Sequence, residues 1–74
     1  MKVLLYGMIA EKAGSQAIDC AAGSTVELRR ELERRIAGLS DVSYAIAVDR
    51  RVVKEDLLLT GEEEVALLPP FAGG

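Results

Sequence analysis

The residues whose types and spacing could support a chemical reaction lie at the end of the sequence, in the segment LLPPFAGG that covers residues 67–74. Pro69 and Pro70 stiffen the backbone into an extended spacer. Glycine has no Cβ, so Gly73 and Gly74 can enter a channel too narrow for other residues. The group that arrives at the end of such a channel is the Gly74 carboxylate. It resists nucleophilic attack, but as a mixed anhydride with a nucleotide it acylates a sulfur donor readily.

The residues of this tail alone leave two interpretations open. The last residues of a domain are commonly frayed and solvated, and ordering Gly73 and Gly74 would add almost nothing to a core. Alternatively, the prolines hold the tail out toward a partner. We then expect Phe71 to anchor in an apolar pocket of that partner, although it could fold back onto the domain's own surface.

The composition argues against self-contained catalysis. The chain has no histidine, the commonest general base and metal ligand, and its single cysteine, Cys20, cannot form an internal disulfide. Cys20 alternates with apolar residues, which favours a small buried hydrophobe over a reactive thiol. We therefore expect no metal site, no bound cofactor and no turnover by the isolated chain. Turn acids without an apolar pocket to shift their pKa values are usually solvated, and these are Asp19, Asp49, Glu55, Asp56 and residues 62–64.

Charge and hydropathy narrow the possible partners. A net charge of −3 and a pI near 4.8 disfavour binding to a nucleic-acid backbone. The sequence contains no apolar run of about 18 residues and no secretory pattern, so we expect a cytoplasmic protein without a membrane span. Arg50 and Arg51 could pair with acidic groups on a protein partner, although exposed turn residues are more often only solvated.

A small domain must hold the tail, and the apolar pattern predicts its elements. A short helical or irregular connection should follow the first strand and close at Gly14. The three leucines at 57–59 are expected to fill the bottom of the core, and the last strand must stop pairing at Pro69, which has no amide hydrogen. Strands are expected over residues 2–8, 15–21, 43–48, 52–53 and 64–70.

One main helix is predicted to begin at Ser24. Ser24 and Glu27 form an S-x-x-E capping box, and Gly38 suits the carboxyl-terminal cap. Seven of the nine residues in 27–35 are charged with mixed signs, which is typical of a solvated helix face. The apolar stripe that should pack on a sheet consists of Leu28, Leu32, Ile36 and Leu39.

This order of elements predicts an α+β fold of the ubiquitin-like β-grasp type. A mixed sheet would have its first and last strands adjacent in the centre, with one main helix packed across it. A ferredoxin-like layout would need a second helix, for which the chain has no room. We expect a β-grasp domain over residues 1–70 and a flexible carrier tail over residues 71–74.

The segment LLLTGEEEVALLPPFAGG resembles the carboxyl-terminal signature of the small, sulfur-carrying subunit of molybdopterin synthase, with its acidic turn, VA, an apolar pair, two prolines and Gly-Gly. The segments KVLLYG, GSTVEL and AIAVDR extend the resemblance over the whole chain. The resemblance implies that Gly74 is adenylated with ATP by an enzyme related to ubiquitin-activating enzymes. It is then converted to a thiocarboxylate and donates sulfur to a pterin precursor in the large catalytic subunit.

The resemblance also implies roles and partners. Gly73 and Gly74 would form the functional tail of a subunit that is not itself catalytic, and the residues in contact with the partner would be Pro69, Pro70, Phe71 and Ala72. The implied partners are the large catalytic subunit, the adenylyltransferase and a sulfur donor protein, with neither nucleic acid nor membrane involved.

Some residues depart from the family pattern and keep alternatives open. Asp49 stands where asparagine is usual, the glycine of the acidic turn, Gly61, is shifted by one place, and Phe71-Ala72 replaces valine and a hydroxyl residue. The alternatives are a sulfur carrier for the thiazole of thiamine, which usually lacks the double proline, related carriers for tungsten cofactors or protein modification, and a β-grasp interaction module without terminal chemistry.

Overall fold

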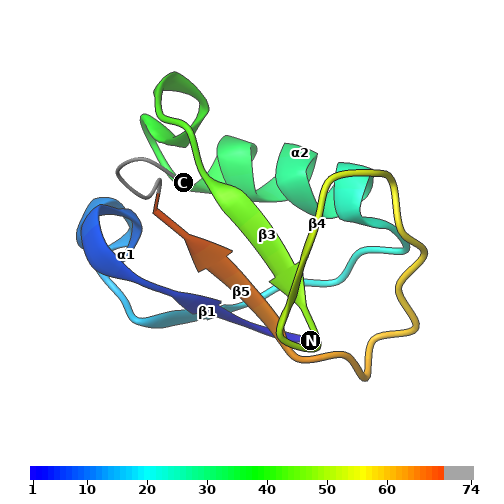
Figure 1. Ribbon diagram of the computed structural model, residues 1–74. Helices are drawn as coiled ribbons and strands as arrows, with labels where there is room; N and C mark the ends of the chain where they lie inside the picture. The colour runs from blue at the N-terminus through cyan, green and yellow to red at the C-terminus, as the bar shows by residue number, and fades with distance from the viewer. Residues whose placement is uncertain (70–74) are drawn as a thin grey trace.

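The computed structural model describes residues 1–69, and it contains one mixed sheet, two α-helices and a short 3₁₀ helix (Figure 1). The predicted tail, residues 71–74, and Pro70 lie outside the described residues. No helix within residues 1–69 is long and apolar enough to cross a membrane. The strands are β1 (Lys2–Leu5), β2 (Ala17–Asp19), β3 (Ala45–Val48), β4 (Arg51–Val53) and β5 (Val65–Leu68). The helices are α1 (Gly7–Ala13), α2 (Thr25–Arg35) and the 3₁₀ helix η1 (Leu39–Asp41).

The strand order in the sheet is β2-β1-β5-β3-β4. The first and last strands, β1 and β5, are parallel neighbours in the centre, and all the remaining strand pairs are antiparallel. The β5 ladder ends where Leu68 pairs with Ala45, directly before Pro69. The predicted topology and the stop at Pro69 are both confirmed.

The core lies between α2 and one face of the sheet. Leu28, Leu32, Ile36 and Leu39 are all buried, as the helical stripe predicted. Side chains alternate between the two faces of a strand, so every second residue of the central strands packs against these four residues. These buried strand residues are Val3, Leu5, Ile46, Val48, Val65 and Leu67.

The start of α2 confirms most of the predicted capping box. Ser24 Oγ accepts a hydrogen bond from the Glu27 amide at 3.3 Å. The Glu27 carboxylate accepts from the Gly23 amide at 3.2 Å, one residue before the position that the motif expects. The Asp56 carboxylate, from the connection after β4, adds a bond from the Val26 amide at 3.1 Å. The Ser24 hydroxyl and the Asp56 carboxylate therefore satisfy two amides in the first turn of α2, and Glu27 satisfies the Gly23 amide just before it.

The other end of α2 differs from the prediction. The helix ends at Arg35, and Ile36 has an extended backbone, whereas Gly38 has φ 83° and is the N-cap of η1. Leu39 reaches the core from this 3₁₀ turn, so the apolar stripe outlasts the helix. The charged face is solvated, as predicted, and Glu31 pairs with Arg34 at 2.5 Å and with Arg35 at 3.5 Å.

The first strand is also shorter than expected, because a second helix follows it at once. β1 ends at Leu5, and α1 begins at Gly7 with φ +57°. The prediction that the chain has no room for a second helix was wrong. Seven residues suffice because Ile9 is buried in the shared core and Gly14, at φ 73°, closes the helix.

The three leucines of the connection after β4 do not all fill the core. Only Leu59 is buried, whereas Leu57 is exposed and 81% of Leu58 is open to solvent. The Leu57 carbonyl accepts a hydrogen bond from the Thr25 amide, and the Leu59 amide donates to the Gly23 carbonyl, both at 2.9 Å. These two bonds fix the segment as a bridge beside the start of α2, and the alternation across it turns Leu58 outward.

Candidate functional site at the tail exit

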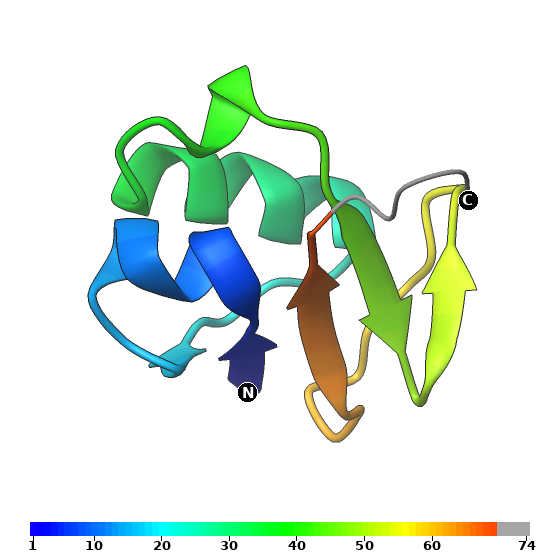
Figure 2. The same cartoon turned by 60° about the vertical axis from the view of Figure 1, so that its left-hand side comes forward.

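The site is the place where the chain leaves the sheet. Leu68 is the last paired residue of β5, Pro69 follows it, and both are partly buried. Pro69 lies against the start of α1, because a Cβ at Gly7 would stand 3.2 Å from Pro69 Cγ. Figure 2 shows β5 running in one direction toward this exit, parallel to β1. The last described residue, Pro69, therefore lies between the sheet and α1.

Most of the predicted site residues belong to the tail itself. Of the partner-binding set, the structure places Pro69 alone. Pro70, Phe71 and Ala72 lie outside the described residues, and so do Gly73 and Gly74, which were expected to carry the chemistry. Their predicted roles stay predictions.

An apolar surface on the sheet leads to the tail exit. Alternation places these side chains on the face away from α2, which no helix within residues 1–69 covers. Tyr6 and Val52 are large exposed hydrophobic residues, and the face is hollowed into a shallow depression. We call this surface the outer-face patch and define it as Leu4, Tyr6, Ala47, Val52, Ala66 and Leu68.

The outer-face patch was not predicted from the sequence. The segments KVLL and VALL carry apolar residues at successive positions, which places them on both faces of the sheet. In a sheet with helices on one face only, such a pattern leaves an apolar face without a partner in the fold. The successive apolar residues in these two segments are the sequence feature from which the outer-face patch could have been predicted.

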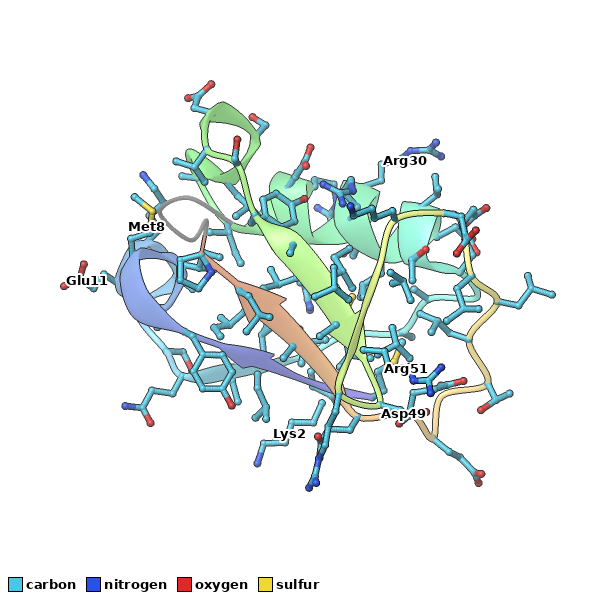
Figure 3. The ribbon with its side chains drawn as sticks, viewed as in Figure 1. Lys2, Met8, Glu11, Arg30, Asp49 and Arg51 are labelled. Atoms are coloured by element: carbon cyan, nitrogen blue, oxygen red, sulfur yellow. The ribbon has the colours of Figure 1, made fainter. Side chains whose placement is uncertain are left out.

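Charged side chains border the end of this patch that lies away from the tail exit. Arg50, in the turn after β3, pairs with Glu64 at 3.4 Å, and both are solvent-exposed. Figure 3 shows Lys2 at the same end of the sheet as Asp49 and Arg51. Charged side chains therefore border one end of the patch, and the other end reaches Leu68 and Tyr6.

The turn between β3 and β4 explains one departure from the family pattern. Asp49 and Arg50 both have positive φ, 50° and 69°. Two such residues form the tight turn that matches the twist of a hairpin. Aspartate tolerates this conformation as asparagine does, and Asp49 Oδ1 accepts from the Glu64 amide at 3.0 Å. The substitution thus keeps the turn.

The acidic turn before β5 is held by one of its own carboxylates. Gly61 has φ +101°, and the Glu63 side chain accepts from the Thr60 amide at 2.8 Å and from the Gly61 amide at 3.0 Å. These hydrogen bonds, that of Thr60 above all, lower the Glu63 pKa from its usual 4.5 to about 2. The shift therefore reflects a structural carboxylate, not a general acid or base.

Cys20 confirms the structural interpretation of the lone thiol. The side chain is buried in the main core cluster. Burial raises the pKa of the thiol, which disfavours the reactive thiolate. Within residues 1–69 there is also no cluster of carboxylates and Cys20 that could hold a metal ion.

A mixed sheet whose first and last strands are parallel neighbours in the centre, with one main helix across it, defines a β-grasp domain. The fold resembles the crystal structure of SAMP1 from Haloferax volcanii, with a TM-score of 0.73 and 21% identity over 99% of this chain and 97% of that one. This likeness confirms the predicted fold.

The sequence comparisons show the family. Residues 3–74 match the model of the ThiS family, and the chain belongs to that family. The chain is also 35% identical to the molybdopterin synthase sulfur carrier subunit of Escherichia coli strain K12, over 100% of this chain and 99% of that protein. The family resemblance expected from the tail motif is thus confirmed along the whole chain.

Proposed function

We propose that this protein is a sulfur carrier for molybdopterin biosynthesis, with the Gly74 carboxylate as the carrying group. The observation that carries the proposal is the 35% identity to the Escherichia coli sulfur carrier subunit along practically the full length of both chains. The exit of β5 supports it, because the tail starts at Pro69, at the end of the outer-face patch, where a docked partner could receive it.

The proposed cycle has two activation steps and one delivery step. The Gly74 carboxylate attacks the α-phosphorus of ATP in an activating enzyme, which forms an acyl adenylate and releases pyrophosphate. A sulfide-level sulfur from a donor protein then attacks the acyl carbon, so a C–S bond forms as the C–O bond to AMP breaks. The product is a thiocarboxylate and AMP.

In the delivery step, the thiocarboxylate sulfur attacks an electrophilic carbon of a pterin precursor in the large catalytic subunit, so a C–S bond forms as a C–O bond at that carbon breaks and the oxygen leaves with a proton. Water then cleaves the acyl C–S bond, which leaves the sulfur on the pterin and returns the Gly74 carboxylate. The carrier supplies a nucleophile at high local concentration, and the partner supplies the catalytic groups. This division of labour suits a chain without histidine.

The proposed docking surface is the outer-face patch. It combines Tyr6 and Val52, which are large and exposed, with Leu68 next to the tail. Interfaces are commonly centred on such aromatic and aliphatic side chains. A partner seated on this patch would place its active-site channel beside Pro69.

The test is intact-mass analysis after incubation with ATP, sulfide and a candidate activating enzyme. We expect the mass change of one oxygen replaced by one sulfur, located by fragmentation at Gly74. The matched control carries one alanine after Gly74 and should gain no sulfur. Equal modification of both chains, or of neither chain by any activating enzyme that thiocarboxylates a known carrier, would refute the proposal.

The same experiment separates a carrier from an interaction module, and an assay of precursor conversion separates the two carrier pathways. A pure interaction module would bind its partner with or without the added alanine and would gain no sulfur. For a carrier of the thiamine pathway, sulfur would be gained, but the modified chain would convert a thiazole precursor and not a pterin precursor.

A further inference from the structure

A backbone position that glycine adopts readily lies against the last described residue of the chain. Gly7 has φ +57°, in the left-handed region, at the junction of β1 and α1. A Cβ at this position would stand 3.2 Å from Pro69 Cγ and 3.7 Å from Pro69 Cβ. A distance of 3.2 Å is shorter than ordinary contact between carbon atoms, so any side chain at position 7 would press on the proline ring.

The elements on either side of this contact are firmly held, and Pro69 is the part that can shift. Ile9 fixes α1, because its side chain is fully buried in the core. Leu67 is fully buried as well, and it pairs with Leu5 and with Ile46. Pro69 follows the last pair of the ladder and has no amide hydrogen to donate to it. A pressure on the contact would therefore displace Pro69.

We propose that Gly7 is a positioning residue for the tail: its bare Cα lets Pro69 pack against α1 and so sets the point and direction from which residue 70 leaves the domain. The inference rests on the proposed function, in which Gly74 must reach the nucleotide of an activating enzyme. Gly7 touches no substrate and acts through Pro69. A side chain here would start the tail from a displaced point, and fewer docked complexes would hold Gly74 within reach.

The chain contains a matched control for this contact. Gly14 also has a positive φ, +73°, but an added Cβ there would meet nothing within 4 Å. Gly7→Ala and Gly14→Ala therefore introduce similar backbone strain at the two ends of α1. Only Gly7→Ala adds the clash with Pro69, so the difference between the two variants reports the contact.

The kinetic test compares adenylation of the full-length variants by the activating enzyme. We expect both variants to melt at a lower temperature than the wild type. We expect kcat to fall by roughly tenfold in Gly7→Ala alone, with KM unchanged, because the outer-face patch still docks. An equal kcat in the two variants, or a rise in KM with kcat unchanged, would overturn the proposal.

A double-mutant cycle with Pro69→Ala tests whether the effect passes through the ring. When the ring is removed, Gly7→Ala should cause little further loss of kcat. A loss of the same size in both backgrounds would mean that Gly7 acts through the fold and not through Pro69.

An enzyme-free measurement separates this inference from the proposed function. In the isolated full-length protein, NMR should show an NOE between Gly7 Hα and Pro69 Hγ. The amide shifts of Phe71 and Ala72 should change in Gly7→Ala and stay unchanged in Gly14→Ala. If no activating enzyme adenylates the wild type, the proposed function fails while these spectra still decide the positioning role. Equal shifts in the two variants would refute that role.

Discussion

At the scale of single residues, carboxylates that the sequence scatters over turns are assigned separate structural tasks by the fold. Asp56 caps α2, Asp49 accepts from the Glu64 amide, and Glu63 accepts two amides of its own turn. None of these bonds joins two carboxylates into a site. Their structural use depends on backbone geometry that the sequence does not display.

Glu63 should make the stability of the domain depend on acid pH. Its folded pKa of about 2 lies below the usual 4.5. The stabilisation is therefore fully present above pH 4.5 and is lost as pH falls toward 2. We expect Glu63→Gln to lower the urea midpoint at pH 7 and to leave it nearly unchanged at pH 2.

The control is Glu62→Gln, because the Glu62 side chain accepts no hydrogen bond within residues 1–69. Urea titrations of both variants across this pH range provide the measurement. If the two variants lose the same stability at every pH, the Glu63 hydrogen bonds do not stabilise the turn.

At the scale of elements, residue types alone predict that a turn joins β3 to β4, but they do not predict which residues adopt positive φ. The sequence predicted a turn at residues 49–51, and the structure confines it to Asp49 and Arg50, both with positive φ. Aspartate adopts this conformation with little strain, but arginine does not. Arg50 is therefore the weak point of the turn, and its exposed ion pair with Glu64 offsets little of the cost.

We expect Arg50→Gly to raise the free energy of unfolding by about 0.5–1 kcal/mol, because glycine removes the left-handed strain. Arg51→Gly is the matched control. Arg51 is a β4 residue without positive φ, so this variant should lose about 0.5–1 kcal/mol. Urea denaturation measures both changes. A loss of stability in Arg50→Gly would show that the ion pair outweighs the strain.

Two further segments show why the sequence did not predict every local structure correctly. The leucines at 57–59 look alike in the sequence, but backbone hydrogen bonds to Gly23 and Thr25 decide which of them faces inward. Likewise, the first strand is predicted to run to residue 8 and a helical or irregular connection to follow it up to Gly14, whereas the structure has a helix over Gly7–Ala13 with Ile9 buried in the core. In both cases a long-range contact selects between local alternatives of similar propensity.

At the scale of the whole molecule, the domain has one covered and one open face. The predicted fold, strand order and main helix follow from periodicity, capping residues and the family resemblance. The outer-face patch could not be derived in that way, because apolar residues on both sides of a strand are equally compatible with a second covering layer. Only the full topology shows that the helices of residues 1–69 leave this face open.

The proposed docking role of the outer-face patch can be tested with two valines of similar exposure. Val52, on the patch, is 52% exposed, and Val26, on α2, is 43% exposed. Val52→Glu should change the free energy of unfolding by less than about 1 kcal/mol. It should weaken binding to the large catalytic subunit by at least about tenfold, because a charge would be buried at the interface.

Val26→Glu should bind the large subunit as the wild type does. Isothermal titration calorimetry with both variants gives the dissociation constants. If the two variants bind equally well, the partner docks elsewhere and the outer-face patch has another role.

The central position of β5 has a consequence for damaged molecules. β5 is the strand that joins the β2–β1 pair to the β3–β4 pair, and it is also the strand from which the tail departs. A protease that cut in the exposed connection before Val65 and released β5 would therefore split the sheet and the outer-face patch together. The remaining fragment would lack both the tail and an intact outer-face patch. It would therefore not compete with intact chains for their binding partners.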